Sequence, residues 1–159
     1  MNTNIQEIKD LSIGFKSQKG EQISILRNIT TNIRKGETVG IVGESGSGKS
    51  TLALAMMGYI KHGLFTTGGE CLFKSKDLLS LNNKELEDIR GRKIAMIPQN
   101  AGQALTPNLK IGYQIEEALK LHTDFSKVER EQKISELLNQ VRLPSPSIMA
   151  LRYPHELSG

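Results

Sequence analysis

Apolar and polar residues alternate along the first third of the chain. Alternation with a period of two is typical of a strand that buries one face, and a polar break between two such runs indicates a turn. The break falls at residues 17–20. The apolar positions on its two sides are Ile5, Ile8, Leu11, Ile13 and Phe15, then Ile23, Ile25, Leu26, Ile29 and Ile33. The pattern predicts an antiparallel β layer at the start of the chain.

Two short apolar runs, residues 38–42 and 94–97, lack this alternation. Such runs are expected for strands that are buried on both faces of a parallel sheet. The first run leads through a glycine-rich turn into an apolar segment that is predicted to be a helix from about Leu52 to Gly58. Gly68 and Gly69 are expected to break the chain before a short strand at 70–73.

The rest of the chain has the patterns of helices. Asn82 followed by Glu85 predicts a capped helix start, and Ser126 followed by Glu129 forms the same capping box. One amphipathic helix is predicted to bury Ile111, Ile115, Ala118 and Leu119, and the next to bury Val128, Ile134, Leu138 and Val141. Pro144 and the proline two residues later are expected to stop the second of these helices.

Composition favours an ordinary globular chain over a nucleic-acid-binding one. The 159 residues suffice for one domain, and the formal net charge is +4 with a pI near 9.2. The densest basic cluster, Arg90, Arg92 and Lys93, lacks the interleaved aromatic residues of a nucleic-acid groove. We therefore interpret the charge as a solvated surface with a mild positive bias, and we expect no nucleic-acid partner.

The sequence carries no signal for secretion or membrane insertion. Its longest apolar stretch, residues 52–57, is too short to cross a bilayer, and the N-terminus lacks a basic region followed by an apolar one. The single cysteine, Cys71, excludes an internal disulfide and is expected to be a small packing residue within a strand.

Residues 43–51 carry the clearest chemical signal. They read Gly-Glu-Ser-Gly-Ser-Gly-Lys-Ser-Thr, a complete phosphate-binding loop between the predicted strand at 38–42 and the apolar helix. A triphosphate needs many oriented donors, and glycines let backbone N–H groups approach its oxygens. The alternative, a chance glycine turn, is disfavoured by the strand and helix patterns that flank the loop. We predict a nucleoside triphosphate site made of Gly43, Glu44, Ser45, Gly46, Ser47, Gly48, Lys49, Ser50 and Thr51.

The side chains of this loop have distinct expected roles. Lys49 would reach the β and γ phosphates as a point charge, and the Ser50 hydroxyl would ligate Mg²⁺. Thr51 can add a donor near the α phosphate. The helix that follows favours an anion at its start, because its first N–H groups are unpaired. The predicted cofactors are ATP and Mg²⁺.

The order of three motifs resembles a known family. After the phosphate loop come a strand that ends in Gln99, a helical insert, and Leu-Ser-Gly at 157–159 preceded by Tyr-Pro-His-Glu at 153–156. This order resembles the ATP-binding subunits of ABC transporters, and more narrowly those of dipeptide, oligopeptide and nickel importers. The resemblance implies an α/β fold with a P-loop NTPase core and an N-terminal antiparallel β layer in residues 1–100. It implies a helical subdomain in residues 101–159, incomplete at the C-terminus because the sequence stops inside the signature motif.

The resemblance also implies further site residues. Phe15 falls where the family stacks an aromatic side chain on adenine, and it can equally be a core aromatic of the β layer. Gln99 matches the glutamine that contacts Mg²⁺ and the attacking water, so the implied catalytic residues are Lys49 and Gln99; the alternative for Gln99 is an ordinary loop amide. Ser158 and Gly159 match the start of the signature, which contacts the γ phosphate held by a second ATP-binding subunit.

The implied function is that of an ATP-hydrolysing, energy-coupling subunit at the cytoplasmic face of the cell membrane, which drives import of peptides or nickel. Its implied partners are transmembrane permease subunits, a second ABC ATPase subunit and, indirectly, a solute-binding protein. Two alternatives remain: a non-transport ABC protein acting on nucleic acid or in translation, and a truncated product that only binds nucleotide.

The sequence departs from the family pattern in two places. Residues 100–108 differ from the stretch common in peptide importers, and the acidic strand and switch histidine of the family are absent. His62, His122 and His155 do not match that histidine by motif. We therefore expect the chain alone to be inactive in hydrolysis. We also expect poor solubility or marginal folding, because the missing acidic strand would leave an apolar edge of the sheet exposed.

Overall fold

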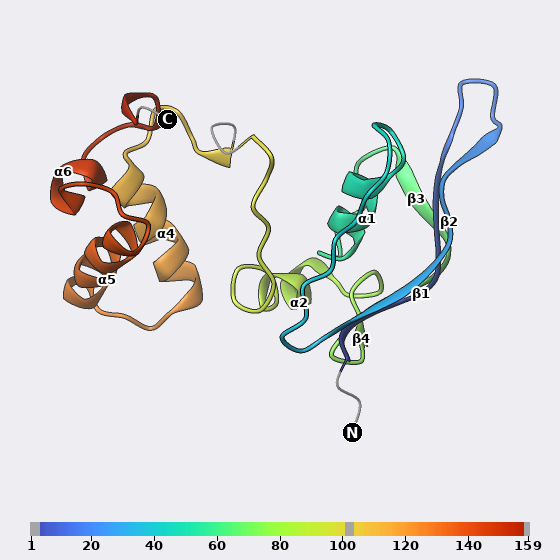
Figure 1. Cartoon of the computed structure of the whole chain (residues 1–159), viewed down its shortest axis with the longest axis horizontal. Helices are drawn as coiled ribbons and strands as arrows, with labels where there is room; N and C mark the ends of the chain where they lie inside the picture. The colour runs from blue at the N-terminus through green and yellow to red at the C-terminus, as the bar shows by residue number, and fades with distance from the viewer. Residues whose placement is uncertain (1–3, 101–103, 158–159) are drawn as a thin grey trace. The chain divides into compact units, whose positions relative to one another are not determined.

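The structure, a computed structural model, describes residues 4–100 and 104–157. The chain divides into two compact units, Met1–Ile94 and Ala95–Gly159. In the described residues, the first unit combines strands with helices, and the second unit is built of helices (Figure 1).

A four-stranded antiparallel sheet forms most of the first unit. The strands are β1 (Asn4–Lys16), β2 (Gln22–Arg34), β3 (Leu64–Phe73) and β4 (Lys76–Asp77), in the order β2-β1-β3-β4. The turn between β1 and β2 closes through a hydrogen bond from the Gly20 N–H to the Ser17 carbonyl, 2.9 Å long. The predicted antiparallel β layer and its polar turn are therefore confirmed.

The expected break at Gly68 and Gly69 is wrong, because β3 runs through both glycines. The register between β1 and β3 shifts between Lys9 and Ser12, and Gly69 has a φ of +83° opposite this irregularity. A glycine permits a bulge here, since it adopts a positive φ and lets the neighbouring backbone approach closely. The two glycines bend the strand and do not end it.

Helix α1 (Lys49–Ala55) packs against one face of this sheet (Figure 1). Its Leu52 and Ala55 enter a core with Ile8, Leu11, Ile13, Leu26 and Cys71. A second core, made of Phe73, Leu78, Leu86 and Ile89, anchors the short helix α2 (Asn83–Glu87). The predicted start of α2 is confirmed, because Asn82 and Glu85 form a capping box.

The two predicted parallel strands are not formed in the described residues, which is a correction to the sequence analysis. Residues 38–42 and 94–97 are extended but have no ladder partner beyond a single bridge between Arg90 and Ile94. A strand requires hydrogen bonds to a neighbouring strand, and apolar character alone does not supply them. Val42 and Ile97 are each 93% exposed, whereas Ile94 is partly buried against the second core.

The second unit is a small helical cluster. It contains α4 (Ile111–His122), α5 (Lys127–Gln140), α6 (Pro146–Ala150) and a 3₁₀ turn, η1 (Pro154–Glu156). Its core consists of Ile111, Ile134 and Leu138, with partly buried neighbours that include Ile115 and Leu119. The capping box of Ser126 and Glu129 is confirmed at the start of α5.

Three predicted core positions of this unit are wrong. Ala118, Val128 and Val141 are exposed, because α4 and α5 share a narrow seam around Ile134 and leave their other sides to solvent. The proline prediction also needs correction. Helix α5 ends at Gln140, before either proline, and Pro146 opens α6. Proline suits the first turn of a helix, where its missing N–H has no intrahelical partner.

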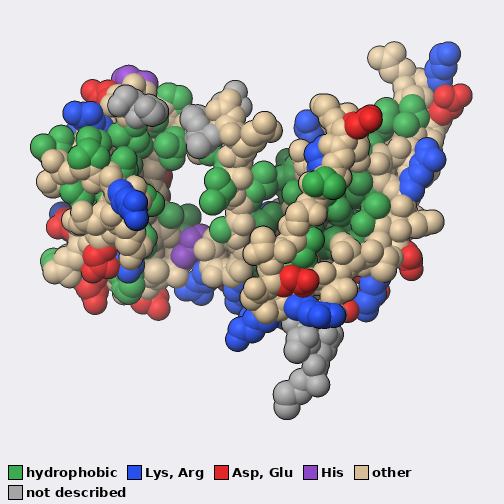
Figure 2. All heavy atoms as spheres, viewed as in Figure 1, with side chains coloured by type: hydrophobic (Ala, Val, Ile, Leu, Met, Phe, Trp, Pro, Cys, Tyr) green, Lys and Arg blue, Asp and Glu red, His purple; other side chains and the backbone are tan. Residues whose placement is uncertain are grey.

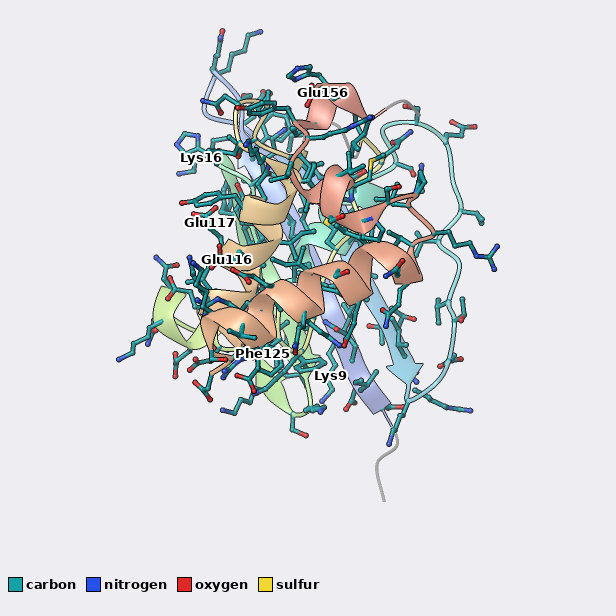
Figure 3. All side chains as sticks on the ribbon, turned by 90° about the vertical axis from the view of Figure 1, so that its left-hand side faces the viewer. Lys9, Lys16, Glu116, Glu117, Phe125 and Glu156 are labelled. Atoms are coloured by element: carbon teal, nitrogen blue, oxygen red, sulfur yellow. The ribbon has the colours of Figure 1, made fainter. Side chains whose placement is uncertain are left out.

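Arg130 ties α4 to α5. Its Nε lies 3.3 Å from Oε1 of Glu116, and its Nη1 donates to the carbonyl of Phe125 in the loop between the helices. Glu116 and Phe125 are labelled in Figure 3. Lys120 lies 3.0 Å from the same carboxylate. The hydrogen bond from Lys120, followed by that from Arg130, lowers the pKa of Glu116 below its usual value.

Hydrophobic side chains reach the surface of both units, interspersed with charged ones (Figure 2). None of the helices in the described part of the chain combines the length and the apolar content that a bilayer crossing requires.

Candidate phosphate-binding site

The predicted phosphate loop curls tightly between the end of the extended segment at 38–42 and α1. Gly46 has a φ of +82°, and Gly48, which is the N-cap of α1, has a φ of +91°. Residues with a Cβ rarely adopt such angles, so glycine sets the path of the loop at both positions. The N–H of Ser47 donates to the Glu44 carbonyl across the curl at 3.2 Å.

Strand β2 supports the loop from behind. A Cβ added at Gly48 would lie 2.7 Å from Cδ2 of Leu26 and 3.3 Å from the carbonyl oxygen of Ile25. Leu26 is itself only 4% exposed and belongs to the core beneath α1. The close approach of Gly48 to β2 therefore fixes where α1 begins.

The ammonium group of Lys49 lies inside the curl. It donates to the carbonyls of Gly43, at 2.8 Å, and Glu44, and it lies 3.3 Å from the hydroxyl of Ser47. A lysine in this position places its positive charge within a few ångströms of the backbone of the loop. Its three N–H donors can exchange these neutral acceptors for anionic ones, with which hydrogen bonds are stronger.

Several backbone donors of the loop are unpaired. Among the described residues, the N–H groups of Gly46, Gly48, Lys49 and Ser50 find no hydrogen-bond acceptor. The Ser50 side chain is exposed beside them, and Thr51 is half-buried. Unpaired donors together with one ammonium group and a free hydroxyl form a site for an anion with several oxygens, as a polyphosphate has. The residues present therefore fit a nucleoside triphosphate, and the Ser50 hydroxyl can serve as an oxygen ligand to Mg²⁺.

The remaining predicted site residues are not part of this loop. Phe15 is half-buried on β1, where it pairs with Ile23 of β2 and Leu64 of β3. Gln99 is exposed and belongs to the second unit. Ser158 and Gly159 lie outside the described residues. The structure thus brings residues 43–51 together, and the roles of Phe15, Gln99, Ser158 and Gly159 stay predictions.

Two side chains that contact the end of α1 were missed by the sequence analysis. Gln6 and Arg90 donate to the carbonyls of Met56, Met57 and Gly58. Gln6 was detectable as a polar residue two positions before Ile8, in phase with the buried positions of the strand. Arg90 was counted in a surface cluster, and nothing in its local sequence indicated otherwise.

Comparisons with known proteins agree with these observations. Residues 26–159 match the family model described as ABC transporter. The oligopeptide transport ATP-binding protein OppD of Bacillus subtilis is 42% identical over 99% of this chain and 44% of its own length. OppD of Lactococcus lactis subsp. cremoris is 39% identical over 98% and 46%, and the dipeptide transport protein DppD of that subspecies is 38% identical over 98% and 44%.

Solved structures show the same fold. A dimeric ATP-binding cassette, MJ0796, in a post-hydrolysis state bound to ADP and Pi matches with a TM-score of 0.81 and 30% identity. The match covers 96% of this chain and 63% of that one. The fold is thus that of an α/β ABC ATPase with an antiparallel β layer and a helical cluster.

The chain spans less than half the length of these curated relatives, 44% of OppD of Bacillus subtilis and 46% of OppD of Lactococcus lactis. The family match nevertheless includes the whole phosphate loop and continues to residue 159. From this match and the geometry of the loop, the chain belongs to the ABC transporter family of ATP-binding proteins.

Proposed function

We propose that this chain is part of the ATP-binding, energy-coupling subunit of a peptide importer, in which ATP hydrolysis drives uptake. The observation that carries the proposal is the curled loop at 43–51, which combines unpaired backbone donors with the Lys49 ammonium group. The names of the relatives favour peptides, because they refer to oligopeptides and dipeptides and not to nickel.

Different residues of the loop would bind different parts of MgATP. The N–H groups of Gly46, Gly48 and Ser50 would donate to phosphate oxygens, and Lys49 would exchange its contacts with loop carbonyls for contacts with the β and γ phosphates. The Ser50 hydroxyl would hold Mg²⁺. When bound, Mg²⁺ supplies neutralisation of the charge on the phosphate oxygens.

Hydrolysis would require residues beyond the loop. Gln99 would orient the attacking water and complete the Mg²⁺ site, and Phe15 would stack on adenine. Ser158 and Gly159 would contact the γ phosphate bound by a second ATP-binding subunit. Phosphoryl transfer depends on having these groups in place together, so we infer that this chain alone binds nucleotide and hydrolyses it slowly or not at all.

The proposal includes a location and partners. A subunit of this kind would act at the cytoplasmic face of the membrane, paired with a second ATPase subunit and with permease subunits, and would serve a solute-binding protein indirectly. Support comes from the relatives, which are named as transport proteins, and from MJ0796, which is described as a dimer.

The test is MgATP binding by Lys49→Ala, measured by calorimetry with the full chain. Loss of a charge-assisted contact of about 1.5–3 kcal/mol should weaken binding roughly ten- to a hundredfold. Lys84→Ala, which removes an exposed lysine from α2, is the matched control and should bind like the parent. Equal affinity of Lys49→Ala and the parent, or no binding by the parent, would reject the proposal.

A further inference from the structure

Three consecutive carbonyls at the end of α1 are held by side chains from two distant parts of the first unit. Nε2 of Gln6 donates to the Met56 carbonyl at 3.0 Å. Nε of Arg90 donates to Met57 at 2.9 Å, and its Nη2 donates to Gly58 at 2.8 Å. We call Gln6 and Arg90 together the carbonyl clamp.

The Gln6 half of the clamp is fixed within the sheet. Gln6 is the buried polar residue of the described core, with 6% of its surface exposed. Its amide nitrogen also lies 3.4 Å from the sulfur of Cys71 on β3. A buried amide of this kind has its rotamer set by its partners, so β1 presents the donor to Met56 in one orientation.

The Arg90 half is fixed by the turn after α2. The Arg90 N–H donates to the Leu86 carbonyl at 2.8 Å, which continues the helical path of α2. The guanidinium lies 6.0 Å from the ring centroid of Tyr59, within the range of a cation–π contact. Its planar fork meets two carbonyls at once, a geometry that a lysine ammonium does not reproduce.

Helix α1 needs such an anchor because it is short. It has seven residues, too few for a helix to be stable by its own hydrogen bonds. The last carbonyls of a helix also lack intrahelical partners. Gln6 supplies a partner for the carbonyl of the C-cap residue Met56, and Arg90 places a positive charge just beyond the end of the helix, where the dipole favours it.

The end of α1 beside the carbonyl clamp is packed as tightly as the end beside the phosphate loop. Gly58 has a φ of +70°, and a Cβ there would lie 2.7 Å from Cδ2 of Leu86 and 3.1 Å from Cβ of Leu78. Since Gly48 is held against Leu26 at the other end, α1 is fixed at both termini. A change at the clamp would therefore be transmitted over seven residues to the phosphate loop.

From this geometry we propose that Gln6 and Arg90 are positioning residues for the phosphate loop, acting through α1 without being part of the loop. The inference rests on the proposed function, because it assigns these residues to nucleotide binding. It predicts that the affinity for MgATP depends on two side chains outside residues 43–51.

The experiment measures MgATP affinity and thermal unfolding of the full chain for Arg90→Met, Arg90→Lys and Gln6→Met. Arg90→Met keeps an apolar side chain against Tyr59 and loses both hydrogen bonds, so binding should weaken about tenfold. Arg90→Lys keeps the positive charge and should recover part of the lost affinity, so that it binds MgATP about threefold more weakly than the parent. Gln6→Met loses one neutral hydrogen bond and should weaken binding about threefold.

Two control variants separate positioning from general destabilisation. Gly20→Ala strains the turn between β1 and β2, where φ is +84° and nothing lies within 4 Å of the added Cβ, and is compared at equal distance below its own melting temperature. Lys93→Met removes an exposed positive charge from the same basic cluster. Both should keep the affinity of the parent.

The outcomes are distinct. If folded Arg90→Met binds MgATP within about twofold of the parent, or if Gly20→Ala weakens binding as much as Arg90→Met does, the inference is overturned. If Arg90→Met does not fold, the same twofold criterion for MgATP affinity is applied to Arg90→Lys and Gln6→Met. Absence of binding by the parent would remove the proposed function and the inference with it, whereas binding that depends on Lys49 but not on Arg90 would remove the inference alone.

Discussion

Replacement of Gly69 by alanine tests the account of the sheet. Gly69 lies in β3 opposite the irregular part of β1, with a φ of +83°. A Cβ at this position would approach backbone atoms of Lys9 and Asp10 to less than 3.0 Å, a separation that real Cβ atoms essentially never show. Because the crowded atoms are backbone, they cannot move aside without separating β1 from β3.

Gly63 is the matched control. It has nearly the same φ, +86°, in the turn before β3, but nothing lies within 4 Å of the Cβ that alanine would add. The left-handed backbone conformation should cost both variants about 1–2 kcal/mol. Gly69→Ala should lose about a further 1–3 kcal/mol because the core sheet is overpacked.

The assay is urea unfolding of the full chain followed by far-ultraviolet circular dichroism at one protein concentration. We expect the free energy of unfolding of Gly69→Ala to lie at least about 1–2 kcal/mol below that of Gly63→Ala, with similar denaturant slopes. If the two variants lose the same free energy within about 0.5 kcal/mol, the close approach of β3 to β1 is not present in solution.

Two further predictions concern α5 and the surface. Ser126→Ala should lower the free energy of unfolding by about 1 kcal/mol through loss of the helix cap, as measured by urea unfolding. Hydrogen bonds from Ser126, mainly from its side chain and next from its backbone, lower the pKa of the Glu129 carboxyl group below its ordinary value of 4.5. The ionised carboxylate therefore contributes its full stabilisation above pH 4.5. This stabilisation should be lost as the pH falls through the lowered pKa of Glu129. Glu129→Gln should abolish the contribution of Glu129 to the acid dependence of stability without removing the helix cap. Val42→Thr changes a residue that is 93% exposed, so it should alter the free energy of unfolding by less than about 0.5 kcal/mol. It should also reduce self-association, as measured by sedimentation velocity. A loss of more than about 1 kcal/mol would show that Val42 is packed.

The elements that could be predicted are those whose signal is local. The alternation around Ile8 and Leu26 specified a hairpin because one face of each strand is buried, and the register places these faces together. The capping boxes at Asn82 and Ser126 were predictable because they are made within four residues. The phosphate loop belongs to the same class, since its curl is set by its own glycines, such as Gly48.

The features that escaped prediction depend on partners distant in sequence. Whether residues 38–42 form a strand depends on a neighbouring strand, which apolar composition cannot provide. Val128 continues the apolar stripe of α5, but the seam with α4 reaches only Ile134 and Leu138. Arg90 was read as a surface charge because the carbonyls that it contacts lie more than thirty residues earlier.

The division of residues between the two units decides how the proposed roles can be tested. The contacts that shape the phosphate loop, from Leu26 behind Gly48 to Arg90 behind α1, all lie in the first unit. Gln99, the proposed water-orienting residue, belongs to the second unit. Phosphoryl transfer requires the phosphate donors and the water-orienting group in place together, so hydrolysis through Gln99 would need groups from both units. Lys49 and Arg90 both lie in the first unit, so nucleotide affinity, not turnover, is the quantity that tests the roles proposed for them.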